Sequence, residues 1–249
     1  MKSTGFLASL EYVSRAQNGA QNLKRFEGNP YVEGDNIAEH LSRVSRLLLC
    51  IASDLKTEFP DKPDLIERVF VTLLLHDDDE IIDGIEIPTA MKLHNVKDEE
   101  EISKFEQSVA SLDPETQKYF ISAFSSFRRK DSLAAKIAKA LDNISGNQLV
   151  IEQKVGLINP DQARFAIEYV EKVRGISKTV DALIDAQISQ IVEGRKWLKE
   201  HPDEAKVLIE GLVKPIQQET LRRILDLLEI DVSVHELDNS KINLSLEKL

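Results

Sequence analysis

The sequence predicts an all-α protein built as a helical bundle, and three observations favour this class. Apolar residues recur at three- and four-residue intervals through most of the chain, which is the spacing of one buried helix face. Pro114, Pro160, Gly175 and Pro202 separate these periodic stretches, as expected of helix boundaries. Strict alternation of apolar and polar residues, typical of strands, is confined to the C-terminal end. With 249 residues, 42% of them hydrophobic, the chain can bury a sizeable core.

The first clear helix covers Asp35 to Lys56, with Asp35 or Asn36 as its N-cap. Its buried face comprises Ile37, Leu41, Val44, Leu48, Ile51 and Leu55. Pro60 and Pro63 mark a loop, and the next helix is expected from Asp64 to about Ile82. After a loop at residues 87–92, further helices are predicted over residues 98–110, 114–127, 132–148, 161–174, 176–199 and 203–229.

The C-terminal end differs from the rest of the chain. Residues 231–237 (DVSVHEL) and 241–247 (KINLSLE) alternate around a DNS turn, which indicates a small β-hairpin. We therefore expect a main domain over residues 1–175 and a helical extension over residues 176–249, ending in the hairpin and packed on the same body. An isolated hairpin is only marginally stable, so it needs such a packing partner.

Charge and composition exclude several classes of protein. The net charge of −11 disfavours a nucleic-acid or anionic-membrane surface, because both depend on positive charge. No apolar run reaches membrane-spanning length, and Glu11 interrupts the segment where a signal peptide would need an unbroken apolar region. The single cysteine, Cys50, lies in an apolar periodic stretch and is expected to be a core residue in a reducing compartment. We expect a cytoplasmic protein.

The stretch VTLLLHDDDEIIDG, residues 71–84, ends an apolar run in a histidine and four consecutive acids. On a continuous helix, Asp77 and Glu80 continue the apolar face, with His76 at its edge. Acids near a helix C-terminus oppose its dipole, and carboxylates on an inward face repel each other, so a divalent cation is expected among them. We expect Asp78, Asp79 and Asp83 to form a solvated helix end.

One helix turn cannot encircle a metal ion, so further ligands must come from other helices. His40, in DNIAEH, is one candidate, although a lone histidine there is more often a core-edge residue bonded to backbone. Asp142, in AKIAKALDNISGN, is the other, because its helix face carries small residues that allow close approach. The remaining histidines, His94, His201 and His235, are expected at the surface or in loops, and the basic residues Arg128 to Lys130 and Lys136 are expected on a solvated face.

The set of His40, His76-Asp77 and Asp142 resembles the HD-domain superfamily of metal-dependent phosphohydrolases. The motifs DNIAEH, LLLHDDDEIIDGIEIPTAMK and KALDN are similar to those of its bacterial 5′-deoxynucleotidase (YfbR-like) branch, over roughly residues 20–150. The resemblance implies an HD-type helical bundle that acts as a metal-dependent 5′-nucleotidase on (deoxy)nucleoside monophosphates. It also implies a homodimer.

The resemblance also implies roles for single residues. His40, His76, Asp77 and Asp142 would hold one divalent ion, which is Mn, Co, Fe, Zn or Mg. Asp77 would thus act in catalysis as a ligand, and Glu80 would hold the attacking water or pass a proton to the leaving group. Substrate contacts are expected from Arg25 to the phosphate, Phe26 to the sugar, Glu86 to a sugar hydroxyl, and Lys139 to the phosphate.

The chain departs from the family pattern at two places. DGIEIPT is one residue longer than the family's GDIPT, which puts the role of Glu86 in doubt, and Phe26 stands where the family carries tryptophan. Two alternatives therefore stay open: a dNTP triphosphohydrolase or other phosphohydrolase with the same site, and a non-catalytic nucleotide-binding or scaffold protein. Between the second and third motifs only His94 is available as a further histidine, so one metal ion is expected, not two.

Overall fold

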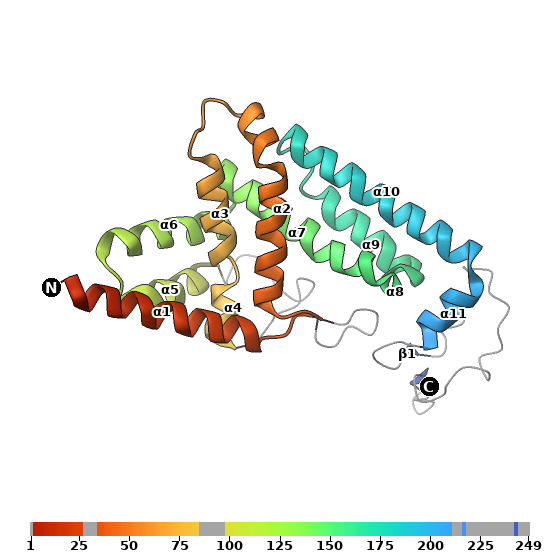
Figure 1. The fold of residues 1–249 in the computed structure, drawn as a ribbon, viewed down its shortest axis with the longest axis horizontal. Coiled ribbons are helices and arrows are strands. Elements are labelled where there is room, and N and C mark those ends of the chain that lie inside the picture. Colours follow the sequence, from red (N-terminus) through yellow and green to blue (C-terminus); the bar gives the residue numbers. More distant parts are fainter. Residues whose placement is uncertain (1, 27–33, 85–97, 211–215, 218–241, 244–249) are drawn as a thin grey trace. The chain divides into compact units, whose positions relative to one another are not determined.

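The computed structural model describes residues 2–26, 34–84, 98–210, 216–217 and 242–243, and the regular secondary structure within them is helical apart from two very short strands (Figure 1). This confirms the predicted all-α class. The helices are α1 (Lys2–Asn22), α2 (Ile37–Glu58), α3 (Leu65–Leu75), α4 (Asp78–Asp83), α5 (Asp98–Val109), α6 (Pro114–Arg129), α7 (Leu133–Gln153), α8 (Val155–Ile158), α9 (Pro160–Glu171), α10 (Lys178–Glu200) and α11 (Pro202–Glu210).

The chain divides into two compact units. The first contains Met1–Phe26, Asp35–Ser145 and Val173–Asp181, and the second contains Gly146–Lys172 and the described residues from Ala182 on. In the second unit, the side chain of Asn147 donates to the carbonyl of Ala166 at 2.6 Å, which ties the end of α7 to α9. The domain boundary expected near residue 175 stays a prediction.

The core of the first unit forms around α2, whose buried residues follow helical spacing: Ile37, His40, Val44, Leu48, Ile51 and Leu55. Asn36 caps this helix through a capping box with Glu39, which confirms one of the two expected caps. Helix α2 packs on α1 and α3, and α3 packs on α6 (Figure 1). Phe105 of α5 stacks on Phe124 of α6 with ring centroids 4.2 Å apart, in an apolar cluster that joins α5 and α6 to the end of α3.

The single helix predicted from Asp64 to Ile82 is wrong, because the chain breaks at His76-Asp77 into α3 and α4. At the break, the ring Nδ1 of His76 lies 2.6 Å from the carbonyl of Leu73. Helix α4 then begins at Asp78, so its acids occupy a first turn, where a helix dipole favours negative charge. Gly84, with φ 67°, ends α4 in the left-handed conformation that glycine adopts without strain.

Three further differences from the sequence predictions concern the ends and the surface. Helix α1 was not anticipated. The helix expected over residues 203–229 does not continue as such, since α11 ends at Glu210 and Ile216–Gln217 forms strand β1. Cys50 is exposed, not a core residue, because it faces away from the buried stripe of α2.

Strand β1 pairs in parallel with β2 (Ile242–Asn243). The first arm of the expected hairpin, residues 231–237, lies outside the described residues. Within the described part of the chain, no helix combines the length and the apolar character needed to cross a membrane.

Candidate metal centre

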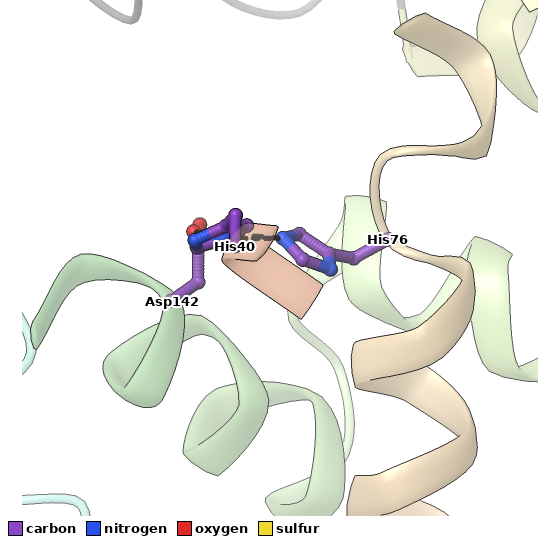
Figure 2. Close-up of side chains that lie close together, drawn as sticks. All are labelled: His40, His76 and Asp142. Carbon is purple, nitrogen blue, oxygen red and sulfur yellow. Dashed lines mark hydrogen bonds and ion pairs between the residues drawn. The ribbon is translucent and has the colours of Figure 1, made fainter. Parts of the chain in front are cut away.

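Three separate helical segments of the first unit bring His40, His76 and Asp142 together (Figure 2). His40 lies one turn into α2, His76 lies at the end of α3, and Asp142 lies in the middle of α7. Each offers one ligand atom, and these atoms all lie within 4.8 Å of one another. All three residues are buried, and His40 is fully so.

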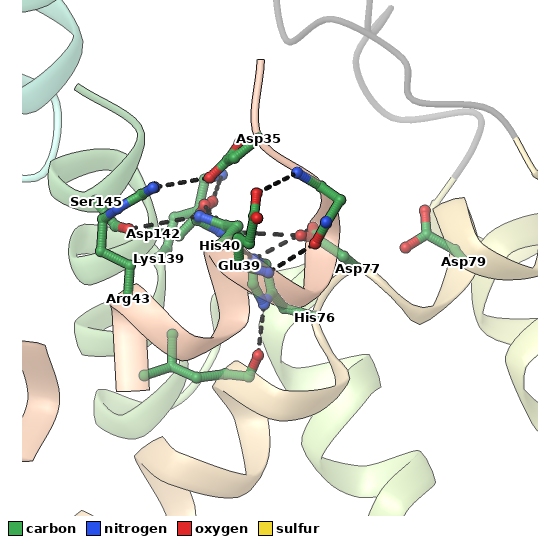
Figure 3. A network of polar contacts seen from close by, with 12 residues as sticks. Asp35, Glu39, His40, Arg43, His76, Asp77, Asp79, Lys139, Asp142 and Ser145 are labelled. Carbon is green, nitrogen blue, oxygen red and sulfur yellow. Dashed lines mark hydrogen bonds and ion pairs between the residues drawn. The ribbon is translucent and has the colours of Figure 1, made fainter. Parts of the chain in front are cut away.

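The distances within the cluster are those of groups that face a common point. The two Nε2 atoms of His40 and His76 are 3.3 Å apart, and Oδ1 of Asp142 lies 3.2 Å from the first and 3.5 Å from the second. Asp77 lies at the edge of the cluster, with Oδ1 3.2 Å from Nε2 of His76 and Oδ2 3.9 Å from Nε2 of His40 (Figure 3). The structure therefore brings together all four residues that the sequence named as metal ligands.

The donor set fits a divalent cation. A carbonyl oxygen can only accept a hydrogen bond, so Nδ1 of His76 is the protonated nitrogen and donates to the carbonyl of Leu73. When the ring is neutral, Nε2 is unprotonated and its lone pair points into the cluster. The hydroxyl of Ser145 lies 3.4 Å from Nδ1 of His40 and can play the same part there. Histidines that bind metal ions usually donate their second nitrogen in this manner. Oδ2 of Asp77 is buried and has no hydrogen-bond partner, so it too is available as a ligand.

The surroundings shift the pKa values of the two histidines of the cluster in opposite directions. Burial lowers the pKa of His40, and the positive charge of Arg25 lowers it further. Burial also lowers the pKa of His76, but the carboxylates of Asp77 and Asp142 outweigh it and raise the pKa above the ordinary value. The carboxylates of the cluster therefore favour positive charge at His76, whereas burial and Arg25 disfavour it at His40.

Both carboxylates of the cluster remain ionised. Burial raises the pKa of Asp142, but Lys139 and then His76 lower it to well below its ordinary value. For Asp77 burial likewise raises the pKa, and His76, His40 and Arg25 together lower it on balance. Hard and borderline divalent ions bind such carboxylate and imidazole donors.

The other acids of the run have partners of their own, and the expectation of a solvated helix end is wrong for Asp78 and Asp79. Asp78 is buried and accepts a hydrogen bond of 2.6 Å from the hydroxyl of Tyr12 on α1. Its burial raises its pKa to about 7. Asp79 is buried in an ion pair with Arg128 of α6, and Figure 3 shows it apart from the cluster. Asp83 is partly exposed and pairs with Lys104 at 3.0 Å.

Arg25 is held beside the cluster by a short backbone pairing. Its N–H donates to the carbonyl of Asp35 at 2.7 Å, and Ile37 donates to Leu23 at 3.1 Å, so residues 23–25 run along the start of α2. Burial lowers the pKa of Arg25, but the charges of Asp77 and other nearby carboxylates raise it on balance. Its Nη1 is buried and has no hydrogen-bond partner. A hydrogen-bond donor of this kind, beside a cluster of candidate metal ligands, is suited to binding an anion.

The remaining substrate residues named from the sequence have different outcomes. Phe26 is half-buried at a φ of 59°, with its ring 5.3 Å from the guanidinium of Arg25. Lys139 pairs with Oδ2 of Asp142 at 2.7 Å. Glu80 is buried on α4, and its negative charge contributes to raising the pKa of both Arg25 and Arg128. Glu86 lies outside the described residues, as do His94 and His235.

Two residues of the site were missed by the sequence reasoning. Ser145 was not singled out from the sequence, although its hydroxyl faces His40. Arg128 was expected on a solvated face, but only 9% of its side chain is exposed. No local signal marks Arg128, because its carboxylate partners lie on α4 and α5, far away in the sequence.

Comparisons with known proteins agree with this geometry. Residues 10–178 match the family described as 5′-deoxynucleotidase YfbR-like. The structure is similar to the crystal structure of a predicted metal-dependent phosphohydrolase from Magnetospirillum magnetotacticum MS-1, with a TM-score of 0.56 and 18% identity over 78% of this chain and 96% of that one. At this identity the likeness shows a shared fold. A search of curated proteins finds no match. Since the family match spans most of the chain and includes the whole His-His-Asp cluster, the protein belongs to the YfbR-like 5′-deoxynucleotidase family and is a phosphohydrolase.

Proposed function

We propose that the protein is a metal-dependent 5′-nucleotidase that converts (deoxy)nucleoside 5′-monophosphates to nucleoside and phosphate. The observation that carries the proposal is the convergence of buried ligand atoms from α2, α3 and α7 within 4.8 Å. The family supplies the substrate class. In this proposal one divalent cation is bound by His40, His76, Asp77 and Asp142.

Such a cation, when bound, would lower the pKa of a bound water molecule to near neutral pH and would offset the negative charge of the phosphoryl oxygens. The protein's own part is to hold the ligand atoms in place and to keep other groups from pairing with them. The carbonyl of Leu73 fixes the ring of His76, and Lys139 holds the outer oxygen of Asp142, so both present a defined atom inward. This arrangement supports a site formed before substrate arrives.

Arg25 is proposed to bind the substrate phosphate. Its unpartnered Nη1 is a buried donor beside two ionised carboxylates, and an incoming phosphate would give that nitrogen an acceptor. A guanidinium binds phosphate through two parallel hydrogen bonds, which also orients it. Phe26, next to Arg25, is proposed to contact the sugar, and Lys139 to lie near the phosphate.

Glu80 is proposed to handle the proton. It lies on α4, three residues after Asp77, and it is buried, so its carboxylate is held within one helical turn of a candidate ligand, where a general acid or base is needed. In this role it orients the attacking water or protonates the leaving alkoxide of the nucleoside.

Product analysis across a panel of dNMPs, NMPs and dNTPs, with Mn²⁺, Co²⁺ or Mg²⁺ added, tests the proposal. We expect orthophosphate from the monophosphates. Release of tripolyphosphate from dNTPs alone would assign the triphosphohydrolase reaction instead, and metal-loaded protein without any turnover would indicate a binding or scaffold role. The homodimer and the cytoplasmic location stay predictions from the sequence, and light scattering on the purified protein checks the first of them.

A further inference from the structure

A buried arginine that the proposed chemistry does not use lies behind the break between α3 and α4. Arg128 is the penultimate residue of α6, and its side chain is 9% exposed, whereas its neighbour Arg129 is 49% exposed and pairs with Glu99 at 2.9 Å. Two adjacent arginines thus have opposite environments. Burying a guanidinium is costly unless it is paired, so its contacts identify what it holds.

Arg128 contacts three segments that meet at the break. Its Nη2 forms an ion pair with Asp79 of α4, and the same nitrogen lies 3.5 Å from the backbone carbonyl of His76. Its Nε lies 3.4 Å from a carboxylate oxygen of Glu101 on α5. One planar group therefore ties α4 and α5 to the backbone of a candidate metal ligand.

The same turn of α6 also contacts the ring of His76. Phe127 lies edge-to-face with that ring, with centroids 5.1 Å apart. The backbone of His76 is thus held by Arg128 and its ring by Phe127, while its Nδ1 is engaged by Leu73. Asp77 follows directly, so the direction in which its carboxylate points depends on the same backbone.

We propose that Arg128 is a positioning residue for the metal centre, a role that rests on the proposed function. By holding Asp79 and the carbonyl of His76, it fixes the angle between α3 and α4 and so the direction in which His76 and Asp77 present their ligand atoms. Loss of an outer-shell partner of this kind lowers metal affinity or activity by about 10- to 100-fold.

The test compares R128K and the double variant D79N/R128M with wild type. R128K keeps the positive charge but cannot span the contacts of a planar guanidinium. The double variant removes both charges of the Asp79–Arg128 pair, so that Asp79 is not left charged without Arg128. R129M is the matched control, since it removes the neighbouring arginine from the surface. For each protein we would measure melting temperature, Co²⁺ affinity by calorimetry and the visible absorption spectrum of the Co²⁺-loaded form.

We expect both Arg128 variants to bind Co²⁺ at least about 10-fold more weakly than wild type and to show an altered Co²⁺ spectrum, with R129M unchanged. Wild-type affinity and spectrum in R128K or in the double variant would overturn the inference, even if the melting temperature fell, because a purely structural role affects stability alone. Failure of the wild-type protein to bind Co²⁺ would instead refute the proposed metal centre itself.

Discussion

Replacing Asp77 by asparagine is the perturbation that probes the metal centre most simply. The change removes one ionised carboxylate whose oxygens lie 3.2 Å from Nε2 of His76 and 3.9 Å from Nε2 of His40, while keeping nearly the same shape. If a dication lies among these atoms, Asp77→Asn removes one of its charged ligands. The variant should then lose most of its response to added metal.

The size of that response follows from linkage. A metal present at 100 times its dissociation constant stabilises the folded protein by about 2.7 kcal/mol. For a chain of this length, 1 kcal/mol shifts the melting temperature by roughly 2–4 °C, so wild type should gain about 5–11 °C. If Asp77→Asn weakens binding 100-fold, the same metal concentration gives only about 0.4 kcal/mol, a shift of at most about 2 °C.

Differential scanning fluorimetry with and without Mn²⁺ or Co²⁺ measures this shift. The comparison is made between the two shifts and not between the two melting temperatures, because the substitution also alters the metal-free protein. Asp83→Asn is the matched control: it makes the same chemical change in the same stretch, at a partly exposed residue paired with Lys104, and should keep the full shift. A full shift in Asp77→Asn would refute the role of this carboxylate as a ligand.

Three further predictions concern catalysis and stability. Glu80→Ala should keep its metal, by elemental analysis, yet lower kcat by roughly 10²–10⁴-fold, and unchanged turnover would remove its proton-transfer role. Arg25→Ala should raise the KM for nucleotide with normal metal content, and Arg25→Lys should recover it only in part because lysine lacks the planar fork; a normal KM in the alanine variant would contradict the phosphate contact. Glu58 accepts hydrogen bonds of 2.7 and 3.0 Å from the N–H groups of Lys178 and Thr179 at the start of α10. Burial raises its pKa, but these bonds lower it on balance. The stabilisation by these hydrogen bonds is therefore present at neutral pH and is lost as the pH falls through the lowered pKa of Glu58. Glu58→Gln should lower the free energy of unfolding, measured with urea, by about 1 kcal/mol at pH 7 and by progressively less in acid. A loss that does not depend on pH would contradict this account.

Most of the helices, apart from α1 and the division into α3 and α4, and the identities of the candidate ligands could be predicted from local sequence features. Periodic apolar residues define the buried stripe of α2, and the pair of Asn36 and Glu39 forms a capping box that fixes where the helix begins. His40 is fully buried on that stripe, whereas the sequence placed it at the edge of the core and placed Leu41 on the buried face. Neutral imidazole and carboxylate are both ordinary ligands of divalent cations, so such side chains on the inward faces of separate helices indicate a metal site.

The break at His76-Asp77 could not be predicted, because the apolar spacing continues through it without interruption. At the end of α3 the ring of His76 contacts the carbonyl of Leu73, and a helical pattern carries no signal for this contact. The break also resolves the electrostatic difficulty of the acidic run. Its acids stand in the first turn of α4, where the helix dipole favours them, and not at the C-terminus of a longer helix.

The burial of Asp78 and Asp79 depends on residues that are distant in the sequence. Asp78 is paired by Tyr12, 66 residues earlier, and Asp79 by Arg128, 49 residues later. Consecutive charges are usually solvated, so the local sequence favours an exposed end. Tyr12 of α1 and Arg128 of α6 supply the partners that compensate for the burial of these carboxylates.

The central claim is that the inward-facing imidazoles and carboxylates surround one divalent ion. The most direct measurement is anomalous X-ray diffraction from crystals grown with Co²⁺ or Mn²⁺. We predict one strong anomalous peak within bonding distance, about 2.0–2.2 Å, of Nε2 of His40, Nε2 of His76 and a carboxylate oxygen of Asp142. A saturated crystal without a peak among these three residues, or with its metal bound elsewhere in the chain, would contradict the account.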